Sequence, residues 1–238
     1  MEPGPEWSET DLAAVRQAYE AALEHCDLIA ISGSLPCAAA EPVVAWMIRT
    51  ARARGRHVAL DSNGAGLRVG LPAAPWLVKP NREELAKVLG EDLSGTAAAW
   101  EAVRHIAAGV EVVLLSAGPG PLLASWQGAE WEAMPPVRTA VNALGGGDSL
   151  VAGVLDAVQR GWPPAEAIRW GTACGAANAV VWDPGRILRD DVERLLPEVT
   201  LRRVTPAHSP SPAATPVPRA ELFEPFSQAG PPTMEGKR

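Results

Sequence analysis

Short apolar runs alternate with amphipathic helical patterns along most of this 238-residue chain, and this alternation constrains its fold more than any other feature. Runs such as HVALD and VEVVLLS have the length of a buried strand, and the segments between such runs repeat apolar residues at helical spacing. Strands that alternate with helices predict a parallel sheet covered by helices on both faces. We expect strands at residues 27–32, 57–61, 76–79 and 110–116, a hairpin over 122–126 and 130–134, and helices at 8–23, 41–54, 82–89, 94–108, from Asp148 onward, at 164–181 and at 190–196.

Composition divides the chain into two segments. We expect residues 1–204 to form one domain, because a chain of this length with 47% hydrophobic residues can bury one substantial core. Residues 205–238 contain eight prolines and few aliphatic side chains. That composition is typical of a disordered or extended tail.

Charge and cysteine content argue against several classes of function. The net charge of −7 argues against a nucleic acid or an anionic membrane as the main partner. The three cysteines lie far apart without a Cys-x-x-Cys pair, which argues against a disulfide framework or a zinc site and fits a reducing compartment. No apolar run reaches membrane-spanning length, and the first residues lack the basic and hydrophobic regions of a signal peptide. We therefore expect a cytoplasmic protein without a membrane partner.

Polar residues at the ends of the predicted strands indicate where a ligand would bind. In parallel sheets with helices on both faces, ligands bind beyond the carboxyl ends of the strands. Four polar side chains occupy these positions, namely Ser32, Asp61, Lys79 and Ser116.

Three consecutive glycines, Gly145, Gly146 and Gly147, stand directly before Asp148 at the start of a predicted helix. Such a turn can aim backbone N–H groups at one point at the positive end of the helix, which favours an anion. The Asp148 carboxylate would repel a resting anion, but it could take a proton from a hydroxyl that attacks phosphorus, so the motif indicates phosphoryl transfer. Taken alone, the motif also fits a plain helix start, because Asp is a preferred N-cap residue.

Two further turns carry groups that suit a sugar or a nucleotide. Ser32 and Ser34 flank a glycine after the first predicted strand and can hydrogen-bond a polyol or a phosphate. Lys79 can reach a nucleotide phosphate from the end of its strand. Asn81 and Glu84 have the spacing of a helix capping box, and a carboxylate near Lys79 could also hold hydrated Mg²⁺.

A turn of small residues follows the clearest predicted strand. Ser116, Gly118 and Gly120 leave the backbone open to close approach, which suits a nucleotide. The same residues fit a tight hairpin connection equally well. They therefore support a nucleotide site only in combination with the other motifs.

Five segments in order, ISGSLP, LDSNG, VKPNREEL, LLSAGPGPLLA and NALGGGDSLVAGVL, resemble the phosphofructokinase B (ribokinase-like) carbohydrate kinase family. SGSLP and KPN-x-x-EL are typical of its 1-phosphofructokinase and tagatose-6-phosphate kinase branch, and EPGPE at residues 2–6 is similar to that branch's NEPGPE segment. The resemblance covers about residues 2–197. It implies a ribokinase-like three-layer α/β/α fold with a mainly parallel sheet.

The resemblance implies a catalytic role for the glycine motif. Asp148 would be the general base that deprotonates the sugar hydroxyl. Gly145, Gly146 and Gly147 would supply N–H groups for the charge that develops on the transferred phosphoryl group. Phosphoryl transfer needs mainly such positioning and charge stabilisation.

The resemblance also implies that ATP and Mg²⁺ bind through the other motifs. Lys79 would contact the ATP phosphates, and Asn81 and Glu84 would position Mg²⁺ through water. The remaining matches line the two substrate sites: Ser116, Gly118 and Gly120 for the nucleotide, and Ser32 and Ser34 for the sugar phosphate.

Two departures from the family pattern bear on function. The family motif reads Gly-Ala-Gly-Asp, and Gly146 replaces its alanine. We expect this change to be tolerated. The family's first strands, with a substrate-binding Asp, a Gly-Gly…Asn segment and a β-lid, have no counterpart, so we expect missing sugar contacts and an exposed sheet edge. A misplaced gene start, a genuine fragment, or a partner that supplies the front half would each account for this.

The resemblance therefore implies an ATP-dependent kinase that makes fructose 1,6-bisphosphate from fructose 1-phosphate, with residues 1–204 as the nucleotide-binding portion of its domain. Tagatose 6-phosphate is the alternative substrate. A non-catalytic nucleotide-binding fragment, or a regulatory or assembly partner, is the alternative function. In relatives the lid often forms the dimer contact, so a full-length form is expected to be a homodimer.

Overall fold

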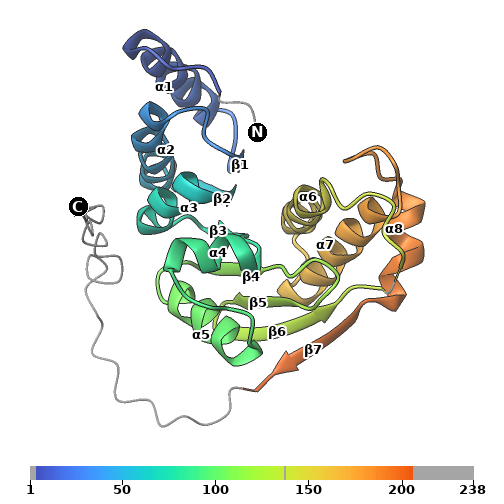
Figure 1. The fold of residues 1–238 in the computed structure, drawn as a ribbon. Coiled ribbons are helices and arrows are strands. Elements are labelled where there is room, and N and C mark those ends of the chain that lie inside the picture. Colours follow the sequence, from blue (N-terminus) through green and yellow to red (C-terminus); the bar gives the residue numbers. More distant parts are fainter. Residues whose placement is uncertain (1–3, 137, 206–238) are drawn as a thin grey trace, which may run out of the picture.

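A seven-stranded sheet with the strand order β1-β2-β3-β4-β5-β6-β7 forms the middle of the fold (Figure 1). The computed structural model describes residues 4–136 and 138–205, so the expected proline-rich tail lies outside the described residues from 206 onward. The pairings from β1 to β4 are parallel and those from β4 to β7 are antiparallel. The strands are β1 (Leu28–Gly33), β2 (His57–Ser62), β3 (Leu77–Val78), β4 (Val112–Leu115), β5 (Leu122–Trp126), β6 (Ala129–Met134) and β7 (Thr200–Val204).

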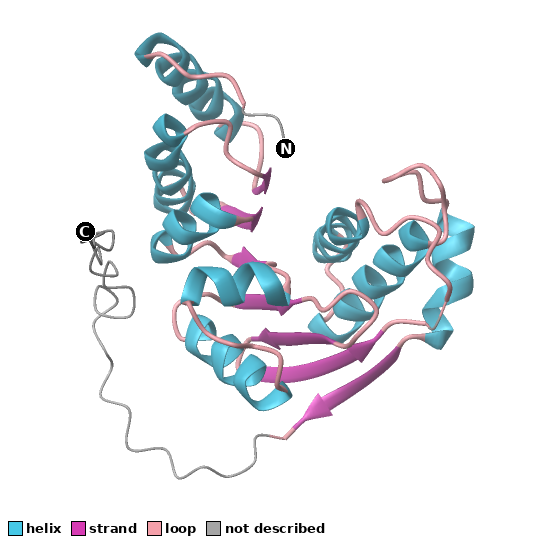
Figure 2. Ribbon diagram, viewed as in Figure 1, coloured by secondary structure: helices cyan, strands magenta, loops and turns pink. Residues whose placement is uncertain are grey.

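Helices cover the sheet in two groups, which Figure 2 shows as the outer layers. One group packs with the strands into one hydrophobic core and the other packs into a second core on the opposite face. The first group is α1 (Glu9–Leu23), α2 (Glu41–Ala53), α3 (Gly64–Gly70), α4 (Arg82–Leu89) and α5 (Thr96–Ala107). The second group is α6 (Gly146–Gln159), α7 (Pro164–Ala179) and α8 (Arg189–Leu195). The expected three-layer α/β/α architecture is confirmed.

Side chains of the inner strands alternate between the two cores. In β2, Val58 and Leu60 belong to the first core and Ala59 belongs to the second. In β4, all four residues are buried, with Val113 in the first core and Val112 in the second. Burial on both faces explains why these strands are continuous apolar runs in the sequence.

The structure confirms the predicted strands, the hairpin and the predicted helices to within a few residues at their ends. It adds two elements that the sequence did not predict, α3 and β7. The α3 segment reads GAGLRVG, and β7 reads TLRRV with its residues exposed or half-buried. In the part of the chain that the structure describes, no helix has both the length and the apolar character needed to cross a membrane.

Helix α6 is held against α7 at close range, which fixes the position of its N-terminus. Val154 of α6 and Ala173 of α7 are fully buried in the shared core. A Cβ added to Gly171 of α7 would lie only 2.7 Å from the Leu150 carbonyl oxygen of α6, so the backbones approach each other more closely than a larger residue would allow. The start of α6 is therefore placed by direct helix packing as well as by the loop before it.

Strand β1 is the edge of the sheet on its N-terminal side. Among the described residues it pairs with β2 alone, in parallel register from Leu28 opposite His57 to Gly33 opposite Ser62. Its residues are exposed or half-buried, in contrast to those of β3 and β4. The expected exposed edge is present in the structure.

Candidate active site

The carboxyl ends of four adjacent parallel strands bring polar side chains to one end of the sheet. Ser32 lies near the end of β1, directly opposite Asp61 near the end of β2. Lys79 follows β3 at once, and its backbone N–H donates to the Leu60 carbonyl oxygen at 3.0 Å. Ser116 follows β4 and makes an isolated parallel bridge to the residue two positions after Lys79. The strand ends thus gather as the sequence predicted.

Asp148, the third residue of α6, reaches the edge of this array. The Ser32 hydroxyl donates a hydrogen bond of 3.0 Å to Oδ1 of Asp148, although the two residues are 116 positions apart in the chain. Both side chains are exposed, so a substrate can approach them. Ser34 lies just beyond the end of β1 and is also exposed.

The glycine turn begins α6 as expected, but the helix starts at Gly146, two residues before Asp148. Gly145 is the N-cap, with φ +79 in the left-handed region that favours glycine. The first N–H groups of a helix have no partner inside the helix, and they lie at the positive end of its dipole. Asp148 therefore sits in the first turn of α6, and the N-cap role that its residue type allowed is taken by Gly145.

Lys79 is buried beside the glycine turn and is paired with a carboxylate. Its side chain is 5% exposed, and its Nζ lies 3.0 Å from Oδ1 of Asp61. The same Nζ lies 3.0 Å from the position that a Cβ on Gly147 would occupy. The Lys79 ammonium is thus fixed between the end of β2 and the start of α6.

Asp61 also belongs to this site, although the sequence predicted no role for it. Burial raises the pKa of its carboxyl, Lys79 opposes this rise, and the nearby carboxylates of Asp148 and Glu84 add to it. Asp61 therefore interacts electrostatically with Lys79, Asp148 and Glu84, the three charged residues that are expected to act in the reaction. Its place at a strand end was the one signal in the sequence that could have identified it.

Asn81 and Glu84 form the capping box at the start of α4. The Glu84 N–H donates to Oδ1 of Asn81 at 2.8 Å, and the Asn81 N–H donates to Oε2 of Glu84 at 2.8 Å. The structure describes no group of three or more His, Cys, Asp or Glu side chains that could hold a metal ion. This donor set fits Mg²⁺ only in the form in which the ion keeps several waters and bonds mainly to phosphate oxygens.

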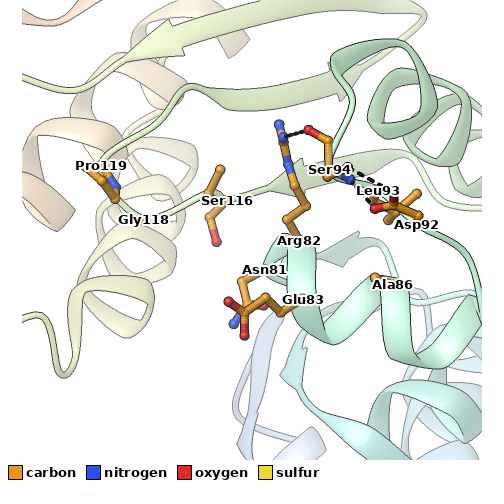
Figure 3. A pocket seen from close by; sticks show the side chains of 11 residues that line it. Asn81, Arg82, Glu83, Ala86, Asp92, Leu93, Ser94, Ser116, Gly118 and Pro119 are labelled. Atoms are coloured by element: carbon orange, nitrogen blue, oxygen red, sulfur yellow. Dashed lines mark hydrogen bonds between the residues drawn. The ribbon is translucent and has the colours of Figure 1, made fainter.

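A pocket of about 660 Å³ opens between α4, the segment before α5 and the turn after β4 (Figure 3). It brings together three residues expected at the nucleotide site, Asn81, Ser116 and Gly118. Gly120 belongs to the same turn, where its N–H donates to the Ala117 carbonyl oxygen at 2.9 Å, but it does not line the pocket. The turn also connects the antiparallel strands β4 and β5, so the hairpin interpretation of these residues is confirmed, while their contact with a nucleotide stays a prediction.

Comparisons with known proteins give a consistent family. The family model of the pfkB family carbohydrate kinases matches residues 6–181. A 1-phosphofructokinase of Rhodobacter capsulatus is 38% identical over 174 residues, which cover 72% of this chain and 55% of that protein. A 1-phosphofructokinase of Bacillus subtilis is 31% identical over 206 residues, which cover 84% of this chain and 66% of that protein. This chain thus spans between about half and two thirds of the length of these relatives.

Solved structures agree with this relationship. Phosphofructokinase-2 from Escherichia coli, in complex with substrates and products, superposes with a TM-score of 0.74 at 26% identity, covering 83% of this chain and 65% of that one. A Thermotoga maritima structure superposes with a TM-score of 0.79 at 23% identity, covering 86% of this chain and 65% of that one, which supports the fold alone. The matched model, the relatives and the shared architecture together show that the chain belongs to the pfkB family of carbohydrate kinases.

Proposed function

We propose that this chain carries the phosphoryl-transfer site of an ATP-dependent sugar-phosphate kinase that converts fructose 1-phosphate into fructose 1,6-bisphosphate. The observation that carries this proposal is the position of Asp148, which lies in the first turn of α6 and accepts a hydrogen bond from Ser32. A carboxylate in this position can accept a proton, and the helix N-terminus beside it can stabilise negative charge on a transferred phosphoryl group.

In the proposed reaction, Asp148 acts as the general base. The Ser32 hydroxyl holds Oδ1, so Oδ2 is available to take the proton of the sugar hydroxyl. The deprotonated sugar oxygen forms a bond to the γ-phosphorus of ATP, the bond from that phosphorus to the bridging oxygen breaks, and ADP leaves with the electron pair. The Asp148 proton is then released to solvent.

The glycine turn and Lys79 stabilise the charge that moves during this transfer. N–H groups of the Gly145–Gly147 turn face the position of the transferred phosphoryl group, and Lys79 binds phosphate oxygens from the other side of Gly147. Asn81 and Glu84 would hold Mg²⁺ through water molecules, and the ion would neutralise phosphate charge. Ser116 and Gly118 contact the nucleotide in the pocket after β4, and Gly120 shapes the turn that carries them.

The names of the relatives favour fructose 1-phosphate as substrate. Two relatives at 38% and 31% identity are named 1-phosphofructokinase. Tagatose 6-phosphate is the alternative, since Ser32 and Ser34 can bond to either sugar phosphate. A coupled assay on both compounds decides between them by the ratio of kcat/KM values.

The test of the proposal compares Asp148→Asn with Asp156→Asn in ATP-dependent phosphorylation of fructose 1-phosphate. The amide introduced by Asp148→Asn can still accept a hydrogen bond from Ser32 but cannot take the proton, so this variant should lower kcat by about 10²–10⁴-fold. Asp156 lies on the same helix and forms an ion pair of 2.9 Å with the exposed Arg160, away from the glycine turn, so its variant is the matched control. Equal rates for Asp148→Asn and the control would refute the proposed role.

A nucleotide-binding protein without kinase turnover is the second candidate. Ser32 and Ser34, on the sugar side, are exposed at the sheet edge, whereas Lys79, on the nucleotide side, is buried. Binding of ATP by calorimetry, without phosphorylation of any hexose phosphate, would favour this candidate and a role as a regulatory or assembly partner. A cytoplasmic location and a homodimeric full-length form remain predictions.

A further inference from the structure

Asn178, near the end of α7, is a polar residue with no exposed surface. Its side-chain oxygen accepts a hydrogen bond of 2.7 Å from the Gly185 N–H and one of 3.3 Å from the Ser149 hydroxyl. Its side-chain nitrogen donates to the Leu144 carbonyl oxygen at 2.7 Å. The amide of Asn178 is therefore bonded as both donor and acceptor.

These three bonds connect Asn178 to the residues on both sides of the glycine turn and to the segment after α7. Leu144 directly precedes Gly145, Ser149 directly follows Asp148, and Gly185 belongs to the segment after α7. A Cβ on Gly145 would lie 3.4 Å from Oδ1 of Asn178, so the amide also packs against the turn itself. Figure 1 shows α6 and α7 side by side, with the segment after α7 returning past the start of α6.

The backbone next to Asn178 strengthens the same connection. The Ala179 carbonyl oxygen accepts from the N–H groups of Val141 at 2.7 Å and Asn142 at 3.2 Å. The Asn142 side chain in turn donates to the Trp182 carbonyl oxygen at 2.9 Å. The end of α7 and the residues after it therefore bond to the chain at Val141, Asn142 and Leu144, directly before the glycine turn.

We infer that Asn178 is a positioning residue that fixes the glycine turn and Asp148 in the geometry needed for phosphoryl transfer, an inference that rests on the proposed function. The planar amide supplies both the donor for the Leu144 carbonyl and the acceptor for the Gly185 N–H. Because the Leu144 carbonyl belongs to the peptide unit that ends at the nitrogen of Gly145, its hydrogen bond sets the direction in which the turn begins. That direction also determines where the N–H groups of the turn point, and these are the groups that would face the phosphoryl group.

The test compares the steady-state kinetics of Asn178→Ala and Asn178→Asp with those of Thr172→Val. Thr172 is a buried polar residue of the same helix, but its hydroxyl bonds to Ile168 within α7, so its variant controls for a general loss of stability. If the Asn178 variants let the glycine turn move, kcat should fall by about 10²-fold, because the turn acts on charge that develops in the transition state. The KM values for both substrates should stay within about threefold of the wild-type values. Asn178→Asp replaces the donor with a carboxylate oxygen that faces the Leu144 carbonyl oxygen in a fully buried site, so it should lose at least as much.

Hydrogen exchange of the backbone amides at residues 144–149, without ligand, gives a readout that does not need activity. Exchange in both Asn178 variants should be at least about tenfold faster there than in the wild-type chain, while exchange in β4 and the affinity for ADP stay within about threefold. If Asn178→Ala fails to fold, Asn178→Asp, which preserves size, carries the comparison.

The outcomes separate this inference from the proposed function. A wild-type chain without kinase turnover refutes the proposed function, and the exchange data then decide whether Asn178 fixes the turn. Kinetic constants equal to those of Thr172→Val in an active chain would overturn the inference. Unchanged exchange at residues 144–149 would overturn it in either case.

Discussion

The Nζ of Lys79 lies 3.0 Å from the position that a Cβ on Gly147 would occupy. Lys79 is 4% exposed and is held on its other side by Asp61, so it has little room to move away. Gly147 is therefore needed for a different reason from Gly145, whose positive φ requires glycine. This difference gives each glycine of the turn its own expected response to substitution.

Gly147→Ala should leave the fold intact and damage the reaction. The new methyl group pushes the end of a side chain rather than a backbone atom, so we expect the melting temperature to change little. A Lys79 ammonium displaced by a few tenths of an ångström should lower kcat/KM for ATP by less than the roughly 10²-fold effect of a misplacement of about 1 Å. Activity equal to that of the wild-type chain would show that Lys79 does not contact the nucleotide.

Gly146→Ala should be tolerated or stabilising. A Cβ at this position meets only the Gly175 carbonyl oxygen at 3.7 Å, an ordinary contact, and φ is not positive. Because alanine loses less backbone entropy than glycine on folding, we expect a gain of about 0.5–1 kcal/mol in the free energy of unfolding with activity retained. Gly145→Ala is the matched contrast: its φ of +79 and a contact of 3.2 Å with Pro184 predict a loss of stability in the same urea titration.

Two substitutions of Asn81 separate its capping role from its proposed role near Mg²⁺. Asn81→Ala removes the acceptor for the Glu84 N–H and should reduce the free energy of unfolding by about 1 kcal/mol. Asn81→Ser restores a good N-cap but not the amide, so it should recover the stability. If the amide also orients water around the metal, Asn81→Ser should still show a raised Mg²⁺ requirement in the kinase assay. A normal Mg²⁺ requirement would restrict Asn81 to the cap.

The buried Asp61 should make stability depend on pH in a defined direction. Its pKa is raised above the ordinary 3.8 by burial, so the folded state binds its proton more tightly than the unfolded state does. The contribution of Asp61 to the free energy of unfolding therefore falls as the pH rises from 3.8 through the raised pKa of the folded state. The Asp61→Asn variant has no titrating carboxyl at this position, so its stability lacks this dependence on pH. We expect the difference in unfolding free energy, wild type minus Asp61→Asn, to be larger at the acidic end of this window than above it.

That difference is measured by denaturant titrations at several pH values. At neutral pH a second effect is present, because Asp61→Asn leaves the buried Lys79 without its carboxylate, which is destabilising. In the acidic window Asp61 itself takes up a proton, so this pairing fades as the pH falls and opposes the slope that burial produces. A difference that rises with pH in this window would mean that the pairing with Lys79 outweighs burial.

The elements that the sequence predicted are those with strong local signals. Asn81 and Glu84 have capping-box spacing, and the structure contains that box. The run VEVVLLS predicted β4, because a strand that is buried on both faces is a continuous run of apolar residues. Ser32, Lys79 and Ser116 were identified by position alone, since residues at strand ends meet at one edge of a parallel sheet.

The features that the sequence missed depend on contacts across the fold. Three glycines in α3 give it a poor helical signal, and the helix exists because Leu67 is fully buried against the sheet. The polar β7 is a strand because β6 offers it an antiparallel partner. Asn178 bonds to Leu144, 34 positions earlier in the chain, and its own neighbours in α7 give no sign of that role.

The hydrogen bond between Ser32 and Asp148 joins the edge strand β1 to a helix that packs in the second core. Among the described residues β1 is held by β2 alone, so it should open at a lower free-energy cost than β3 or β4, which have partners on both sides. Each opening would take Ser32 away from Asp148 and leave the end of β3, with Lys79, in place. If the proposed function holds, we expect warming to abolish phosphorylation of the sugar at a lower temperature than binding of the nucleotide, because only the sugar side depends on β1.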